Sequence, residues 1–255
     1  MSFKYYLGAV IAVPLLPILY FQGKKIRRNV PKLPEAKKPQ GYIKTTSEKT
    51  LKILTIGEST IAGVGVDFHE NGFIGSLAQK IAKETNHSIL WRVYAKSGYT
   101  AKMVRKRIVP KIEETNADLI VIGLGGNDAF KLNSPETWMF QINLLIKTLK
   151  RKFPKTPIYF TNMPPIKEFP AFTSAIKFVI GNLVEILGKR LYRRVQKKSN
   201  VHYNNEIITL ENWQKKYNLD DDVGVFFSDG VHPSKLTYQI WGKDMAQFII
   251  DREKF

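Results

Sequence analysis

The sequence predicts an α/β fold in which a mostly parallel sheet is covered by helices on both faces. Short apolar runs alternate along the chain with longer segments whose apolar residues recur at helical spacing, and this alternation is typical of a doubly wound sheet. The 255 residues suit one α/β domain with or without a tail, and a hydrophobic content of 44% is typical of a globular protein.

The N-terminal segment is the first element, and we expect it to be a membrane anchor over residues 1–23. Residues 5–22 contain no charged side chain, and about 20 apolar residues are enough to cross a bilayer. Pro14 and Pro17 would kink a helix but are tolerated in membrane spans. No small-residue cleavage pattern follows, so an uncleaved signal-anchor is expected; a cleaved signal peptide and a buried N-terminal helix are the alternatives.

Residues 24–48 are expected to form a basic, proline-rich linker that joins the anchor to a folded domain over 49–255. The basic cluster after the apolar run favours the cytoplasmic face for that domain under the positive-inside rule. A periplasmic or other extracytoplasmic domain is the alternative. The sequence therefore predicts a single-pass membrane protein and leaves its orientation open.

The first half of the folded domain is expected to contain three strands and two helices. Residues 51–57 and 118–126 are short apolar runs that end in glycine, which indicates buried strands, and 89–95 is a third apolar run. Residues 72–85 carry apolar side chains at helical spacing, and 100–114 has the pattern of a basic amphipathic helix.

The second half continues the alternation. We expect a helix over 135–151, a strand over 157–162, a long helical region over 171–198, a short segment near 201–208 and a closing helix over 234–252. Ligands of such sheets bind at the carboxyl ends of the strands, so the residues that follow the strands are the candidates for a functional site.

Polar and glycine-rich blocks follow the predicted strands. The first three strands end in G-E-S-T at 57–60, S-G at 97–98 and G-G-N-D at 125–128, and S-D-G-V-H-P at 228–233 precedes the last helix. In a parallel sheet all four blocks would converge on one edge.

These blocks supply the groups that acyl transfer needs: a nucleophile, a base, a group that orients the base, and donors for the developing oxyanion. Ser59 is the candidate nucleophile, at the turn from a strand into a helix, and His232 is the candidate base. Asp229 stands three residues before His232 and can bind its other ring nitrogen. The backbone N–H groups of Ser59 and Gly98 and the Asn127 amide are the candidate oxyanion donors.

At these positions the chain resembles the SGNH, or GDSL-type, hydrolase family. The resemblance covers about residues 50–252 and rests on the four blocks in order: G-E-S-T, K-S-G-Y, G-G-N-D and D-G-V-H. It implies a three-layer, flavodoxin-like fold, an active site without metal or cofactor, and esterase, lipase, thioesterase or carbohydrate-deacetylase activity. The family's first block is usually G-D-S, and the Glu58 that replaces its Asp bears on loop packing more than on chemistry.

We therefore expect a serine hydrolase that cleaves a small-molecule or lipid-like carboxylic ester through an acyl-enzyme. The alternatives are an acyltransferase or carbohydrate O-deacetylase with the same site and, from another class, a non-catalytic membrane-anchored binding module. Taken singly, Ser59 would be a helix cap and Asn127 a turn residue; their occurrence together, in order and at predicted strand ends, favours catalysis.

The apolar stretch 169–187 is either an ordinary core helix or the wall of an acyl pocket. In the second case Phe169 and Phe172, which follow the fourth strand, are expected to bind substrate at the active-site edge.

Other kinds of site lack their signatures. The chain has no cysteine, and His69, His87 and His202 are scattered without the spacing of metal ligands, so we expect surface or loop histidines, no metal and no cofactor. Neither a dinucleotide nor a P-loop motif is present. The net charge of +18 comes without a nucleic-acid-binding motif, so no nucleic-acid partner is expected.

Overall fold

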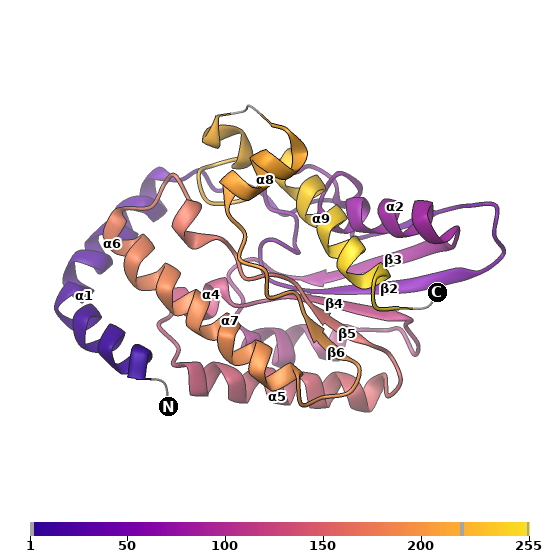
Figure 1. The fold of residues 1–255 in the computed structure, drawn as a ribbon, viewed down its shortest axis with the longest axis horizontal. Helices are drawn as coiled ribbons and strands as arrows, with labels where there is room; N and C mark the ends of the chain where they lie inside the picture. The colour runs from indigo at the N-terminus through magenta and orange to yellow at the C-terminus, as the bar shows by residue number, and fades with distance from the viewer. Residues whose placement is uncertain (1–2, 220–221, 254) are drawn as a thin grey trace.

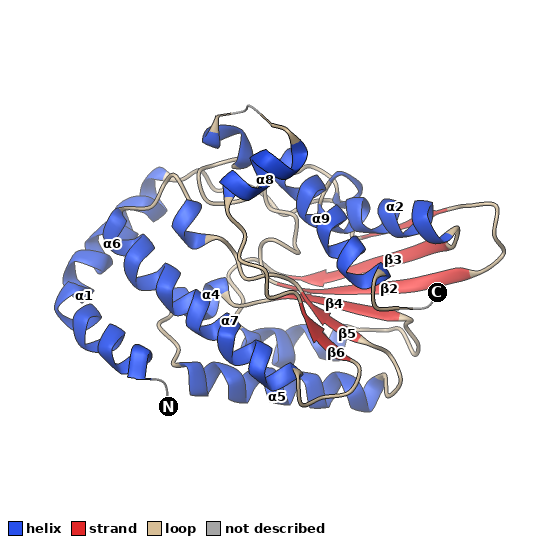
Figure 2. Ribbon diagram, viewed as in Figure 1, coloured by secondary structure: helices blue, strands red, loops and turns tan. Residues whose placement is uncertain are grey.

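The computed structural model describes residues 3–219, 222–253 and 255, and its centre is a mixed six-stranded sheet (Figure 1, Figure 2). The strand order is β1-β3-β2-β4-β5-β6. The parallel strands are β2 (Thr50–Gly57), β3 (Ser88–Ala95), β4 (Leu119–Gly123), β5 (Ile158–Phe160) and β6 (Val201–Tyr203). They follow the 2-1-3-4-5 order of flavodoxin-like sheets, which confirms the predicted fold class.

Apolar side chains on both faces of the sheet explain why its strands are continuous apolar runs. Every residue of β4 is buried, as are the last five of β2, because helices cover both faces. The two strands end side by side, with Gly57 in register with Gly123. A Cβ on Gly57 would lie 2.4 Å from the Gly123 carbonyl oxygen, so this close approach requires glycine.

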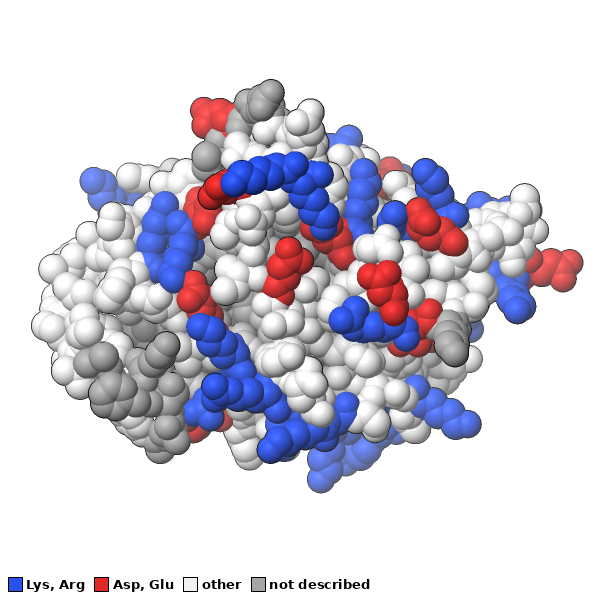
Figure 3. All heavy atoms as spheres, viewed as in Figure 1, with Lys and Arg blue, Asp and Glu red and all other residues white. Residues whose placement is uncertain are grey.

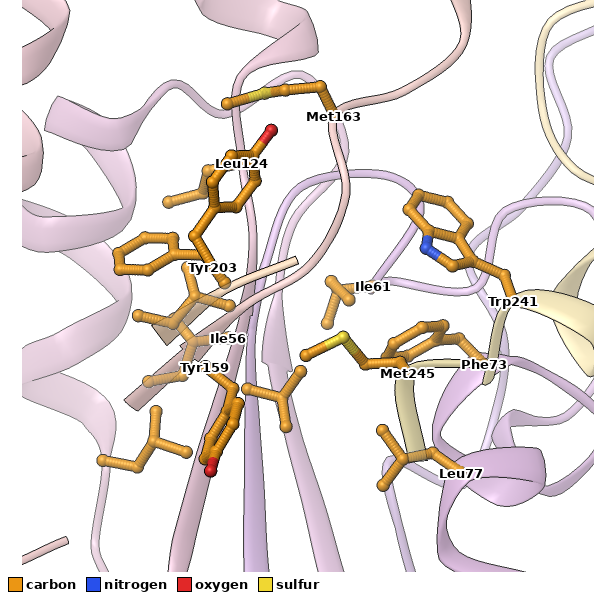
Figure 4. Packing of buried hydrophobic residues seen from close by; sticks show 14 of the residues in the cluster. Ile56, Ile61, Phe73, Leu77, Leu124, Tyr159, Met163, Tyr203, Trp241 and Met245 are labelled. Atoms are coloured by element: carbon orange, nitrogen blue, oxygen red, sulfur yellow. The ribbon is translucent and has the colours of Figure 1, made fainter. Parts of the chain in front are cut away.

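Helices form a layer on each face of the sheet. Figure 1 shows α2 (Phe73–Thr85) and α9 (Lys235–Ile250) on one face, and α5 (Pro135–Lys152) and α7 (Asn182–Val195) on the other. Ser134 and Ser234 cap the N-termini of α5 and α9. Figure 4 shows Phe73 and Met245 packed against one another beside the sheet, and the Phe73 and Trp241 rings meet edge to face at 5.7 Å.

Two of the expected helices are interrupted. The segment expected over 100–114 contains α3 (Ala101–Met103), a π-helical turn (Val104–Ile108) and a 3-10 turn (Val109–Lys111), since Pro110 cannot donate a helical hydrogen bond. The segment expected over 171–198 begins at Ser174 and has a π-helical turn before α7. The other short helices are α4 (Gly126–Phe130), α6 (Ser174–Ile176), α8 (Leu210–Tyr217), η1 (His69–Asn71), η4 (Ile166–Glu168) and η6 (Val223–Phe226).

The N-terminal helix, α1 (Phe3–Asn29), lies along the outside of the domain beside α6 and α7 (Figure 1). The first two residues of the expected anchor lie outside the described residues. The Thr173 hydroxyl lies 2.6 Å from Gln22 Oε1, and Tyr5 and Ile26 are partly buried against the core. The stretch Gly8–Asn29 is long and apolar enough to cross a membrane, a test that a signal sequence also passes.

The expected linker differs most from the structure. α1 continues to Asn29, and residues 36–43 pack against the domain: Ala36 N–H donates to Ala62 O, and β1 (Gln40–Ile43) pairs antiparallel with β3. Glu35 accepts a hydrogen bond from Ser97 N–H at 2.7 Å. β1 forms hydrogen bonds with backbone groups that the edge of β3 would otherwise expose. Since β1 is part of the sheet, the folded region begins before the expected boundary at residue 49.

A truncation series tests this boundary. A chain that begins at residue 31 keeps β1 and Glu35, whereas a chain that begins at residue 49 loses both. Because the second truncation removes backbone hydrogen bonds of β3, we expect its Tm to be lower by roughly 5–10 °C. Thermal unfolding followed by circular dichroism measures the difference, and equal Tm values for the two chains would contradict the assignment of residues 35–43 to the domain.

Candidate active site

Three of the five predicted triad and oxyanion residues line one small cavity at the carboxyl ends of the central strands. Ser59, Asn127 and His232 border a space of about 110 Å³. Ser59 follows β2 and Asn127 follows β4, and the chain runs from β2 and from β4 to opposite sides of the sheet. This divergence opens a crevice, which is the position where sheets of this kind bind ligands.

The sequence predicts that Ser59 lies at the start of a helix. In the structure Ser59 instead lies in a series of turns. Ala62 N–H donates to Glu58 O at 2.8 Å, and α2 begins only at Phe73. A hydrogen bond from α9 holds these turns in place: the buried hydroxyl of Tyr238, a residue of α9, donates to Val64 O at 2.8 Å. Ser59 is half-buried, and within residues 3–219, 222–253 and 255 its hydroxyl forms no hydrogen bond, either to His232 or to another group.

Asp229 and His232 are bound to each other. His232 Nδ1 lies 2.7 Å from Asp229 Oδ2, and Asp229 Oδ1 accepts the N–H groups of His232 and Val231 at 2.7 and 2.9 Å. Desolvation acts to raise the pKa of Asp229, but these hydrogen bonds outweigh it and hold the pKa below its ordinary value. Since an ionised carboxylate occupies Nδ1, Nε2 is the ring nitrogen left for the cavity.

The loop that carries Asp229 and His232 is tied to two other segments. Ser228 Oγ lies 3.1 Å from Gly65 O, which connects it to the turns after Ser59. Ala171 N–H donates to Gly230 O at 3.2 Å, which connects it to the segment before α6.

Glu58 holds Asn127 in place. Its Oε1 accepts Gly126 N–H at 2.8 Å and its Oε2 accepts Asn127 N–H at 3.0 Å, so one carboxylate binds the first two residues of α4. Burial raises the pKa of Glu58 to about 7, although these two hydrogen bonds counteract the effect. The sequence linked Glu58 to loop packing but did not identify α4 as its partner; the signal was an acidic residue directly before Ser59, in place of the family's usual Asp.

The loop of Gly98 is bound to α4, but Gly98 does not line the cavity. Gly98 is exposed and has φ +78°, which a glycine adopts without strain, in a turn where Tyr99 N–H donates to Lys96 O. Asn127 Nδ2 donates to Tyr99 O at 3.2 Å, and the next residue, Asp128, accepts the N–H of Ala101 at 2.8 Å.

Aromatic side chains form one wall of the cavity. Phe169 lines it, and its ring centroid lies 5.4 Å from that of Phe227 and 5.2 Å from that of Phe172. Phe172 packs behind Phe169 and is not a lining residue. Trp213 of α8 also lines the cavity and was missed because α8 was not predicted, although Leu210, Trp213 and Tyr217 have helical spacing after a threonine cap.

Two of the three remaining histidines, His69 and His202, correct the expectation of surface or loop positions. His69 is 4% exposed, and burial lowers its pKa to about 4. His202 lies in β6, stacked on Tyr159 at 4.6 Å. These positions depend on long-range packing that spacing along the chain does not reveal. Throughout the described part of the chain, no three His, Asp or Glu side chains are grouped as a metal site.

Comparisons with known proteins identify the family and the fold. The model of the GDSL-like lipase/acylhydrolase family matches residues 55–240, more than half of the chain. Among solved structures, a member of the lipolytic protein G-D-S-L family from Veillonella parvula is 14% identical, with a TM-score of 0.60 over 80% of this chain and 100% of that one.

Two further structures have the same fold. The lipase/acylhydrolase from Enterococcus faecalis is 19% identical, with a TM-score of 0.55 over 80% of this chain and 97% of that one. The Clostridium thermocellum family 3 carbohydrate esterase is 16% identical, with a TM-score of 0.56 over 80% of this chain and 96% of that one. No curated protein matches the sequence.

Glu58 should make the free energy of unfolding depend on pH. Its pKa rises from an ordinary 4.5 to about 7 on folding, so its favourable contribution is full below about pH 4.5 and is lost as the pH rises through 7. We expect the stability of the wild-type protein to fall between about pH 5 and pH 8, relative to a Glu58→Gln variant that cannot ionise, by on the order of 2 kcal/mol.

Urea denaturation over this pH range measures the effect. The pKa of Asp229 is lowered, so that carboxyl titrates below this window and does not contribute. If the stabilities of the two proteins change in parallel with pH, Glu58 does not titrate as inferred.

Proposed function

Since the chain belongs to the GDSL-like lipase/acylhydrolase family, a family of ester-hydrolysing enzymes, we propose that it cleaves carboxylic esters with a catalytic triad of Ser59, His232 and Asp229. The observation that carries this proposal is the 2.7 Å contact between His232 Nδ1 and Asp229, together with the cavity that Ser59 and His232 share. Family membership also favours an enzyme over a non-catalytic binding module.

In the acylation step, His232 Nε2 accepts the proton of the Ser59 hydroxyl as Oγ attacks the ester carbonyl. Ionised Asp229 stabilises the resulting imidazolium through Nδ1. The tetrahedral intermediate collapses when His232 returns the proton to the leaving alcohol oxygen, and an acyl group remains on Ser59. Hydrogen bonds between nucleophile and base are often loose in an empty site and tighten with substrate, which fits the unbound Ser59 hydroxyl.

The oxyanion donors in this proposal are the N–H groups of Ser59 and Gly98 and the side-chain amide of Asn127. Asn127 lines the cavity, and its Nδ2 carries two hydrogens, of which Tyr99 O accepts one. Gly98 directly precedes Tyr99 in the neighbouring loop, and its N–H would be a further donor to the oxyanion. Water then attacks the acyl-enzyme with His232 as base, which releases the acid and restores Ser59.

The N-terminal helix is proposed to anchor the enzyme in a membrane. Val10, Val13 and Phe21 are 70, 62 and 68% exposed on α1, which is the burial pattern expected if lipid covers them. Lys24, Lys25, Arg27 and Arg28 then lie at the bilayer surface.

Replacement of the nucleophile tests the triad. We expect Ser59→Ala to abolish hydrolysis of p-nitrophenyl acetate and labelling by a fluorophosphonate without changing the circular dichroism spectrum. Ser97→Ala, an exposed serine after the neighbouring strand, is the matched control and should retain wild-type activity. Activity that survives in Ser59→Ala would refute the assignment.

Loss of the Asn127 amide should act on the transition state. We expect Asn127→Ala to lower kcat by about 100-fold with little change in KM, as for other oxyanion donors. Asn133→Ala removes an amide that binds Asp128 without reaching the cavity, and a far smaller loss is expected there. Similar losses in both variants would indicate that Asn127 acts only through the packing of α4.

Fractionation tests the anchor. The full-length chain should sediment with membranes and resist extraction by alkaline carbonate, whereas the chain that begins at residue 31 should stay in the supernatant. Recovery of an intact full-length chain in the soluble fraction would argue against a membrane span.

A further inference from the structure

A second and larger cavity lies next to the catalytic one. It has a volume of about 510 Å³, against about 110 Å³ for the catalytic cavity, and it lies between η4, α7 and the segment that follows β6. Residues 164–166 line both cavities, so a single stretch of chain separates them. Ligand pockets typically enclose roughly 300–1,000 Å³, so the second cavity has the size of a ligand site and the catalytic cavity does not.

The walls of the larger cavity are apolar. Met163, Val184, Tyr203 and Ile208 line its interior, and each is at least nine-tenths buried. Ile207 and Tyr192 line it as well and are 56 and 39% exposed, so the apolar surface continues outward to solvent. The apolar lining of the cavity thus reaches the protein surface at these two residues.

Charged residues of both signs surround this surface. The charged lining residues are Lys167, Lys189, Arg193, Glu168, Glu185 and Glu206, and Lys167 is bound to Glu185 at 2.6 Å. Figure 3 shows basic and acidic side chains side by side on the face that carries α7 and α8. Three positive and three negative charges cancel, so the cavity does not select an anion or a cation, and its apolar walls suit an uncharged chain.

The geometry of the reaction determines which part of an ester would point this way. His232 must protonate the leaving alcohol, so the alcohol lies on the side of the Asp229 loop. The carbonyl oxygen faces Asn127, so the acyl group takes a third direction, and residues 164–166 are the part of the catalytic lining that also borders the larger cavity. The Pro164 ring carbon lies 3.3 Å from the position of a Cβ on Gly126, and beyond Pro164 is the larger cavity.

We propose that the cavity bounded by η4, α7 and residues 205–209 binds the aliphatic chain of the acyl group, so that medium- and long-chain acyl esters are the preferred substrates. This inference rests on the triad proposed above and adds the substrate class. In this proposal the acyl chain extends from Ser59 past residues 164–166, which line both cavities, into the larger cavity.

Cavity-filling variants of the full-length enzyme test the proposal. Val184→Phe narrows the cavity from α7 and Ile208→Phe narrows it from the opposite wall. Val195→Phe is the matched control, because Val195 is a buried valine of the same helix that lines neither cavity. The measurement is kcat/KM for p-nitrophenyl acetate, butyrate and octanoate.

We expect wild-type kcat/KM to rise from acetate to octanoate, and Val184→Phe and Ile208→Phe to lower the octanoate value by roughly 10- to 100-fold while acetate changes little. Val195→Phe should leave the ratio between the two esters unchanged.

A wild-type value that does not rise with chain length overturns the proposal without any variant. So does an equal loss for acetate and octanoate in a folded Val184→Phe or Ile208→Phe protein. A failure of the triad would show itself separately, as acetate hydrolysis that survives Ser59→Ala.

Discussion

The site depends on the parallel pairing of β2 with β4, which ends at the register pair Gly57 and Gly123. There the strands approach so closely that a side chain on Gly57 would collide with the Gly123 carbonyl. Directly beyond this point the segments that follow the two strands separate. The segment after β2 enters the turns of Ser59, and the segment after β4 enters the start of α4. The candidate nucleophile Ser59 and the candidate oxyanion donor Asn127 are therefore neighbours because of how the sheet is ordered, although they are far apart in sequence.

Carboxylates then fix the loops around this point. Glu58 binds two N–H groups of α4, Asp128 binds the N–H of Ala101, and Asp229 binds two N–H groups of its own loop. A buried carboxylate is costly unless it is hydrogen-bonded, and the backbone donors of these loops supply those bonds. Loops without regular secondary structure are thereby held in defined positions, as a preorganised active site requires.

The N-terminal helix lies close in the structure to the loop of Asp229 and His232. Thr173, beside α1, is two residues from Ala171, which is hydrogen-bonded to the loop of Asp229 and His232. The N-terminal helix and the loop of Asp229 and His232 are thus separated by only one short segment. Because α1 packs along the domain through Tyr5, Gln22 and Ile26, a membrane span by this helix would require it to leave these contacts.

Local patterns in the sequence were sufficient for β2, β3, β4 and β5 and for the blocks that follow the strands. Apolar runs such as 118–126 identify buried strands, and the order of strands and helices implies that Ser59, Asn127 and His232 meet at one edge. They were not sufficient for β1, whose four residues carry too short a pattern, or for the interruption of the helices at 104–108 and 177–181.

Only the tertiary structure decided how the candidate residues are used. The clamp formed by Glu58, the burial of His69, the exposed position of Gly98 and the second cavity all depend on contacts between segments distant in sequence. The sequence by itself determined which chemical groups follow which strands, because strand formation follows local hydrophobic periodicity. Burial and hydrogen-bond partners arise from long-range packing, which no local pattern encodes.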